Sequence, residues 1–226
     1  MATKKTATKT AARTAASKPN GSRTTTRSSS RRSSPARSGT GTARDGASDR
    51  GTYTVPGVSE SDAQKVNEVL QARLVALLDL TLTLKHVHWN VVGRDFIGVH
   101  EMLDPQYAEA SKMVDDVAER IATMGGSPNG LAGNIVASRT WEDYSLGLAV
   151  VPQHLAELDV AYSGLIGGHR AAIEKVGDID PVTEDLLIGQ TGRLEMFQWF
   201  VRAHLENGEG EIATAASGRR AAAQAS

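Results

Sequence analysis

Two pairs of potential metal ligands lie on one predicted helix, and their spacing limits how the chain can fold and assemble. His100 and Asp104 are four residues apart, as are Asp115 and Glu119. Residues four apart share a helix face. The eleven-residue step from Asp104 to Asp115 returns to nearly the same face, offset by about 20°, but about 16 Å further along the helix axis. One helix therefore carries both pairs on one side, too far apart to bind a single metal ion.

An antiparallel copy of the same helix would bring the two pairs together. Across a two-fold axis, positions 100 and 104 of one chain would face positions 115 and 119 of the other. Histidine and carboxylate ligands bind iron and leave positions open for an oxidant. The sequence therefore predicts an iron site at a dimer interface, built from His88, His100, Asp104, Asp115 and Glu119. The alternative is that these residues only hold a dimer together by ion pairs and hydrogen bonds.

Apolar residues recur at helical spacing through most of the remaining sequence. They predict helices over about 59–90, 95–124, 144–176 and 182–206, and a long connection over 127–143 with a short helical turn around 131–137. Pro152 moves the start of the third helix later or kinks it, and Pro105 is expected to kink or locally unwind the second. With no strand pattern, the fold class is all-α, a four-helix bundle with a short helix in its longest connection.

The N-terminal segment and the rest of the chain carry opposite net charges. Residues 1–50 hold twelve Lys and Arg against two acidic residues, a net charge of +10, whereas residues 51–226 carry a net charge of −11. Residues 2–50 contain no Val, Leu, Ile, Met or aromatic residue, so they have nothing to bury that would offset the entropy of ordering. We expect a disordered basic tail and linker over 1–58, a bundle over 59–206 and a flexible tail over 207–226.

The regular basic residues of the N-terminal segment predict non-specific binding to double-stranded DNA. Such residues neutralise phosphates and release counterions without reading bases. The alternative is a solvated arm, or one that contacts the acidic body of the protein. Arg219 and Arg220, near the C-terminus, would contribute little. The candidate DNA-binding residues are Lys4, Lys5, Lys9, Arg13, Lys18, Arg23, Arg27, Arg31, Arg32, Arg37 and Arg44.

Other features of the sequence indicate the cell compartment in which the protein is expected. The chain has no cysteine, which excludes disulfides and thiolate metal sites. No segment approaches the roughly 18 apolar residues of a membrane span, and the N-terminus has no apolar signal-peptide core. An organellar transit peptide is disfavoured because the segment has no apolar face beyond alanine. We expect a cytoplasmic, nucleoid-associated protein.

Three sequence blocks carry a family resemblance. The first is Lys85-His86-Val87-His88-Trp89-Asn90-Val91-Val92-Gly93, the second is Phe96-Ile97-Gly98-Val99-His100-Glu101-Met102-Leu103-Asp104, and the third is Ala118-Glu119-Arg120-Ile121. They resemble the Dps family, the ferritin-like DNA-binding proteins from starved cells, and in particular its mycobacterial, actinobacterial members. The later run Phe197-Gln198-Trp199-Phe200 is similar to the last helix of these proteins. The resemblance covers roughly residues 58–206.

The resemblance implies a ferritin-like bundle that assembles into a hollow shell of twelve subunits. It implies a ferroxidase that oxidises Fe²⁺, with hydrogen peroxide as the favoured oxidant, and stores ferric mineral inside the shell. Two iron ions would bind at each inter-subunit site, on the same five ligands that the spacing indicates. Protection of DNA from oxidative damage would follow. The alternative is a nucleoid-compacting structural protein whose iron chemistry is secondary or vestigial.

Several further residues have less specific interpretations. Trp89 is either an aromatic packing anchor or, as the resemblance implies, a sacrificial electron donor. His86 lies about 200° around the helix from His88 and is interpreted as structural or surface. Asp159 is the candidate for an acidic iron-entry pore, and Glu157 and Asp143 are weaker ones; ordinary surface acids are the alternative. We expect Phe197, Trp199 and Phe200 to provide core and interface packing.

Overall fold

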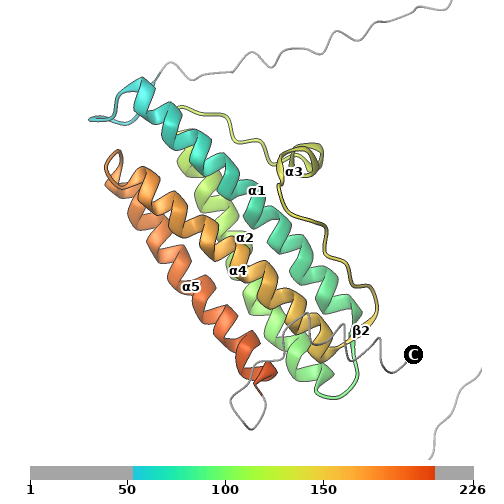
Figure 1. Cartoon of the computed structure of the whole chain (residues 1–226). Coiled ribbons are helices and arrows are strands. Elements are labelled where there is room, and N and C mark those ends of the chain that lie inside the picture. Colours follow the sequence, from blue (N-terminus) through green and yellow to red (C-terminus); the bar gives the residue numbers. More distant parts are fainter. Residues whose placement is uncertain (1–52, 207–226) are drawn as a thin grey trace, which may run out of the picture. The chain divides into compact units, whose positions relative to one another are not determined.

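The computed structural model describes residues 53–206, which form a bundle of four long helices with a short fifth helix beside it (Figure 1). The basic N-terminal segment and the C-terminal tail, with all the candidate DNA-binding residues, lie outside the described residues. The elements in chain order are α1 (Glu60–Asn90), β1 (Val91–Val92), α2 (Phe96–Thr123), α3 (Ala132–Ser138), β2 (Ala149–Val150), α4 (Val151–Val176) and α5 (Pro181–Leu205).

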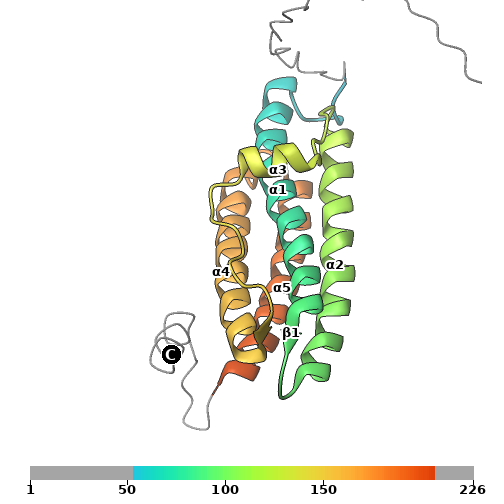
Figure 2. The same ribbon diagram turned by 90° about the vertical axis from the view of Figure 1, so that its right-hand side faces the viewer.

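The four long helices pack as two hairpins. The helices α1 and α2 form one hairpin and α4 and α5 the other, with α1 also packing against α4. The connection from α2 to α4 runs the length of the bundle, and it carries α3 across α1 (Figures 1 and 2). The predicted fold class, an all-α four-helix bundle with a short helix in this connection, is confirmed.

The core of the bundle is aliphatic and follows helical spacing. In α1 the fully buried residues include Leu70, Leu74, Leu77 and Leu84, which recur every three to seven positions. Helix α2 contributes seven buried residues at steps of three and four: Val99, Leu103, Gln106, Ala110, Met113, Val117 and Ile121. Burial of such side chains stabilises a fold by about 1.5–3 kcal/mol each. Because this stripe faces the core, the positions beside it on α2 remain on the surface.

Capping residues and prolines explain where several of the helices begin. Ser59 caps α1, its Oγ accepting a hydrogen bond from the Asp62 amide at 3.1 Å. Helix α4 begins at Val151, so the start near Tyr144 is wrong and the later start indicated by Pro152 is confirmed. The reason is Pro152, which fits the first turn of a helix because its missing N–H needs no partner there. Pro105, in contrast, lies inside α2, which continues unbroken from Phe96 to Thr123.

A two-stranded parallel pairing was not predicted. Val91 pairs with Ala149, and Val92 pairs with Val150. Two-residue strands are too short to show the alternation that marks a strand in sequence. The pairing fastens the chain just after α1 to the chain just before α4. Within residues 53–206, no helix combines the length and apolar character needed to cross a membrane.

Candidate metal centre

Two histidines from different helices orient each other where α1 ends and α2 begins. The rings of His88 and His100 are stacked, with centroids 3.6 Å apart and planes at 24°. His88 Nδ1 lies 3.0 Å from the His100 carbonyl oxygen, and His100 Nδ1 lies 2.9 Å from the His88 carbonyl oxygen. A carbonyl oxygen can only accept, so each Nδ1 carries the proton and donates it. In its neutral form, each imidazole then has its unprotonated nitrogen at Nε2, and this is the form that binds a metal ion.

Asp104 lies beside this pair of histidines. Its Oδ1 is 3.4 Å from His88 Nδ1 and 2.7 Å from Lys85 Nζ. The hydrogen bond from Lys85 is the largest influence on the pKa of the Asp104 carboxyl and lowers it. Lys85 therefore keeps Asp104 ionised and held near the histidines. Sequence reasoning identified the three candidate ligands but not the way the histidines fix each other.

The remaining two candidate ligands lie far along α2. Asp115 and Glu119 are exposed, and neither side chain forms a hydrogen bond or ion pair with another residue in the described range. No three histidine and acidic side chains among residues 53–206 converge as a complete metal site. One chain thus presents two separated sets of ligands on the surface of the bundle. That the two sets meet between chains stays a prediction.

The end of α2 that carries Glu119 is tied to α5 by a buried ion pair. Arg120 donates from Nη2 to Asp180 Oδ2 at 2.5 Å and from Nε to Thr183 Oγ1 at 3.0 Å. Asp180 also caps α5 by accepting from the Thr183 amide at 3.2 Å. Burial by itself would raise the pKa of Asp180, but the hydrogen bonds from Thr183 and Arg120 outweigh it and lower that pKa. The only signal in the sequence is the position of Asp180 directly before Pro181.

The aromatic residues divide between core and surface. Trp89, next to His88, is 71% exposed, so within a single chain it is not a packing anchor. On α5, Phe197 is buried and Phe200 is partly buried against the core, as expected, whereas Trp199 is exposed. The exposed tryptophan beside the histidines leaves the electron-donor interpretation open.

The other predicted residues have partners inside the chain. His86 Nε2 lies 2.6 Å from the Leu146 carbonyl oxygen, so this ring fastens the long connection to α1, in agreement with a structural role. Asp159 Oδ1 accepts from Arg202 Nε at 2.6 Å and from Gln198 Nε2 at 2.8 Å. Asp143 pairs with Arg139. These carboxylates are therefore compensated in the single chain, and the pore assignment stays a prediction.

Comparison with known proteins places this chain in a family. The family described as "Ferritin-like domain" matches residues 67–210. The "DNA protection during starvation protein" of Mycolicibacterium smegmatis is 54% identical over 161 residues, which are 71% of this chain and 88% of that protein. The chain belongs to the Dps family of ferritin-like proteins. The expected resemblance is thereby confirmed.

Two further proteins, one compared by structure and one by sequence, are similar to most of this chain. The solved structure of DpsA14 from Streptomyces coelicolor is 58% identical, with a TM-score of 0.72, and the match covers 74% of this chain and 100% of that one. The "Fine tangled pili major subunit" of Haemophilus ducreyi is 51% identical over 160 residues, 71% of this chain and 85% of that protein.

Proposed function

We propose that this chain is a Dps-type ferroxidase and iron-storage protein. The observation that supports it most strongly is the reciprocal hydrogen bonding of His88 and His100 through Nδ1, which leaves Nε2 of each neutral ring free to bind iron. The Asp104 carboxylate lies beside this pair, 3.4 Å from His88 Nδ1. Free Fe²⁺ is the substrate, and the second half of the site comes from Asp115 and Glu119 of a two-fold-related subunit. Repulsion between these carboxylates would be relieved when iron binds.

In the proposed reaction, one hydrogen peroxide molecule oxidises two ferrous ions. Each Fe²⁺ gives one electron, the O–O bond of hydrogen peroxide breaks, and two protons from solvent complete two water molecules. Because the two electrons arrive together, no hydroxyl radical is released. Trp89, exposed beside His88, would supply an electron when only one iron is bound. The resulting Fe³⁺ moves inward and is stored as mineral in a hollow shell of twelve subunits.

The basic N-terminal segment would give the shell its second activity. Its cations would bind double-stranded DNA without sequence preference, and twelve segments on one particle would add their affinities. This is proposed from the sequence and from the name of the mycobacterial relative, a DNA protection protein. The alternative function, mainly nucleoid compaction, also rests on this segment.

The ferroxidase proposal is tested by following Fe²⁺ oxidation by peroxide in the purified assembly. The double variant His100→Ala, Asp104→Ala should oxidise iron at least about tenfold more slowly, because it loses two ligands. Glu101→Ala is the matched control, since Glu101 is exposed next to His100 but is not a proposed ligand. If the double variant keeps the parental rate, the site assignment is wrong.

The DNA proposal is tested by comparing the full chain with a variant that lacks residues 1–50. The full chain should shift DNA in a gel, with an affinity that falls steeply as salt rises. The truncated variant should lose this binding but keep peroxide-driven iron oxidation. Undiminished, salt-sensitive binding by the truncated variant would contradict the role of the basic segment.

A further inference from the structure

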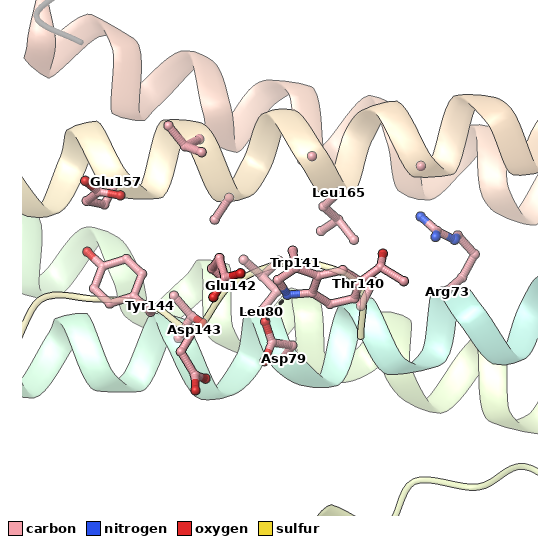
Figure 3. A pocket seen from close by; sticks show the side chains of 16 residues that line it. Arg73, Asp79, Leu80, Thr140, Trp141, Glu142, Asp143, Tyr144, Glu157 and Leu165 are labelled. Carbon is pink, nitrogen blue, oxygen red and sulfur yellow. Dashed lines mark hydrogen bonds between the residues drawn. The ribbon is translucent and has the colours of Figure 1, made fainter. Parts of the chain in front are cut away.

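A cavity of about 530 Å³ lies between α1, α4 and the connection that follows α3 (Figure 3). None of the five proposed iron ligands lines it, although His88 lies near the end of α1. Its volume is in the range of sites for small organic molecules. The buried side chains of Leu80 and Leu165 form an apolar wall, and Trp141 faces them from the connection. The Trp141 ring is held in place because its Nε1 donates to Asp79 Oδ2 at 2.7 Å.

Two glycines one helical turn apart on α4 create the space. A Cβ atom at Gly164 would meet nothing within 4 Å, so this position leaves the cavity open. A Cβ atom at Gly168 would collide with the guanidinium of Arg73, so this side chain lies directly against the helix backbone. Gly168 therefore allows a charged group of α1 to sit at one end of the cavity.

The charge of Arg73 is not compensated within the described part of the chain. Arg73 forms no hydrogen bond or ion pair there, although it is partly buried and burial lowers its pKa. The neighbouring His169 supplies no negative charge, since an imidazole is either neutral or cationic, and burial, with Arg73, keeps it neutral by lowering its pKa to about 4. The acids Asp79 and Asp143 are already paired with Arg139. A partly desolvated guanidinium of this kind favours an anion, ideally a bidentate carboxylate.

We propose that this cavity binds a small monocarboxylate with an apolar body. The carboxylate would pair with Arg73, and the apolar body would lie between Trp141 and the wall formed by Leu80 and Leu165. Figure 3 shows Arg73 at one end of the cavity and Glu157 with Tyr144 at the other. A second negative charge on the ligand would approach Glu157, so monoanions bind better than dianions of the same length. The proposal does not depend on the iron site.

The experiment is calorimetric titration of the full, assembled protein with 3-phenylpropionate, and with its neutral analogue 3-phenylpropanamide. The parent should bind the carboxylate at least about tenfold more tightly than the amide, as expected for a hydrogen-bonded charge pair. Arg73→Met should remove this preference and bind the two probes equally. Absence of saturable binding by the parent, or an undiminished preference in Arg73→Met, would overturn the proposal.

Two glycine variants separate the cavity from the fold. Gly164→Leu should fill the cavity and abolish binding of both probes. Gly167→Leu is the matched control, because Gly167 is also an exposed glycine of α4 with nothing within 4 Å of its Cβ position, yet it does not line the cavity. Both variants should keep parental iron oxidation and particle size, and only Gly164→Leu should lose binding. Equal binding by the two variants would place the ligand elsewhere and overturn the proposal.

Discussion

A neutral histidine binds a metal ion through the ring nitrogen that carries no proton, and here the backbone determines which nitrogen that is. Each of His88 and His100 donates a hydrogen bond from Nδ1 to the carbonyl oxygen of the other residue. The end of α1 and the start of α2 therefore fix the orientation of both rings together. These hydrogen bonds hold the two candidate ligand rings in position, which would lower the cost of ordering the proposed site when iron binds.

A different histidine, His169, contributes to the pH dependence of the free energy of unfolding. His169 is fully buried, and burial, with Arg73, lowers its pKa to about 4, so the folded protein keeps this ring neutral. The unfolded chain takes up a proton below about pH 6.5. The contribution of His169 to stability is therefore complete above pH 6.5, and it is lost at up to about 1.4 kcal/mol per pH unit as the pH falls towards 4.

We predict that His169→Gln removes this part of the acid sensitivity. The measurement is the free energy of unfolding by urea at pH 7 and at pH 5, at a fixed concentration of assembled protein. The parent should lose more stability between the two pH values than His169→Gln. His204→Gln, at an exposed position near the end of α5, should behave as the parent. An identical loss in parent and His169→Gln would contradict the prediction.

At the level of elements, the Arg120–Asp180 ion pair joins the far end of α2 to the start of α5. Asp180 is only 4% exposed, so removing it leaves the Arg120 charge buried without its partner. Breaking a buried pair in this way typically costs about 3–5 kcal/mol. Asp180→Ala should therefore lower the free energy of unfolding by about 3 kcal/mol or more, because α5 also loses its cap.

Asp178→Ala provides the matched control for this element. Asp178 lies in the same loop but is exposed, so its loss should change stability by no more than about 0.5 kcal/mol. Both variants are compared with the parent by urea unfolding at one protein concentration. A similar, small effect of the two substitutions would show that the pair does not stabilise the α2–α5 contact.

The helices could be predicted from sequence because each depends on local spacing and caps. Ser59, Pro152 and Pro181 mark their starts, and the apolar stripe of α2 gives its buried face. The pairing of β1 with β2 could not be predicted, because it joins segments almost sixty residues apart with no pattern of their own. The start near Tyr144 was wrong for a related reason. Residues before Pro152 have long-range partners, since Leu146 accepts from His86 and β2 pairs with β1.

The candidate site shows the same division between local and long-range information. All five candidate ligands follow from spacing along two helices and from the family resemblance. The pairing of Lys85 with Asp104, the mutual orientation of the histidines and the anchoring of Arg120 depend on contacts between helices, so the sequence contains no local sign of them. The uncompensated charge of Arg73 is visible only once Gly168 and α4 are placed beside it.

At the level of the whole molecule, the account depends on a site divided between two chains. One α2 helix carries His100 and Asp104 near its start and Asp115 and Glu119 nearer its end, and the described part of a single chain contains no complete cluster. A two-fold interface would form two identical sites, each taking one half from each chain. Two variants that each lack one half of the site could therefore complement each other, which a site within a single chain does not allow.

The most direct test mixes two inactive variants. The first is His100→Ala, Asp104→Ala, and the second is Asp115→Ala, Glu119→Ala; each should oxidise Fe²⁺ slowly when it assembles alone. When the two are unfolded together in equal amounts and refolded, a mixed pair contains one site with all its ligands, so about a quarter of the sites should be intact. We predict that peroxide-driven oxidation recovers to about a quarter of the parental rate. Recovery to no more than the average of the two variants would contradict an iron site shared between chains.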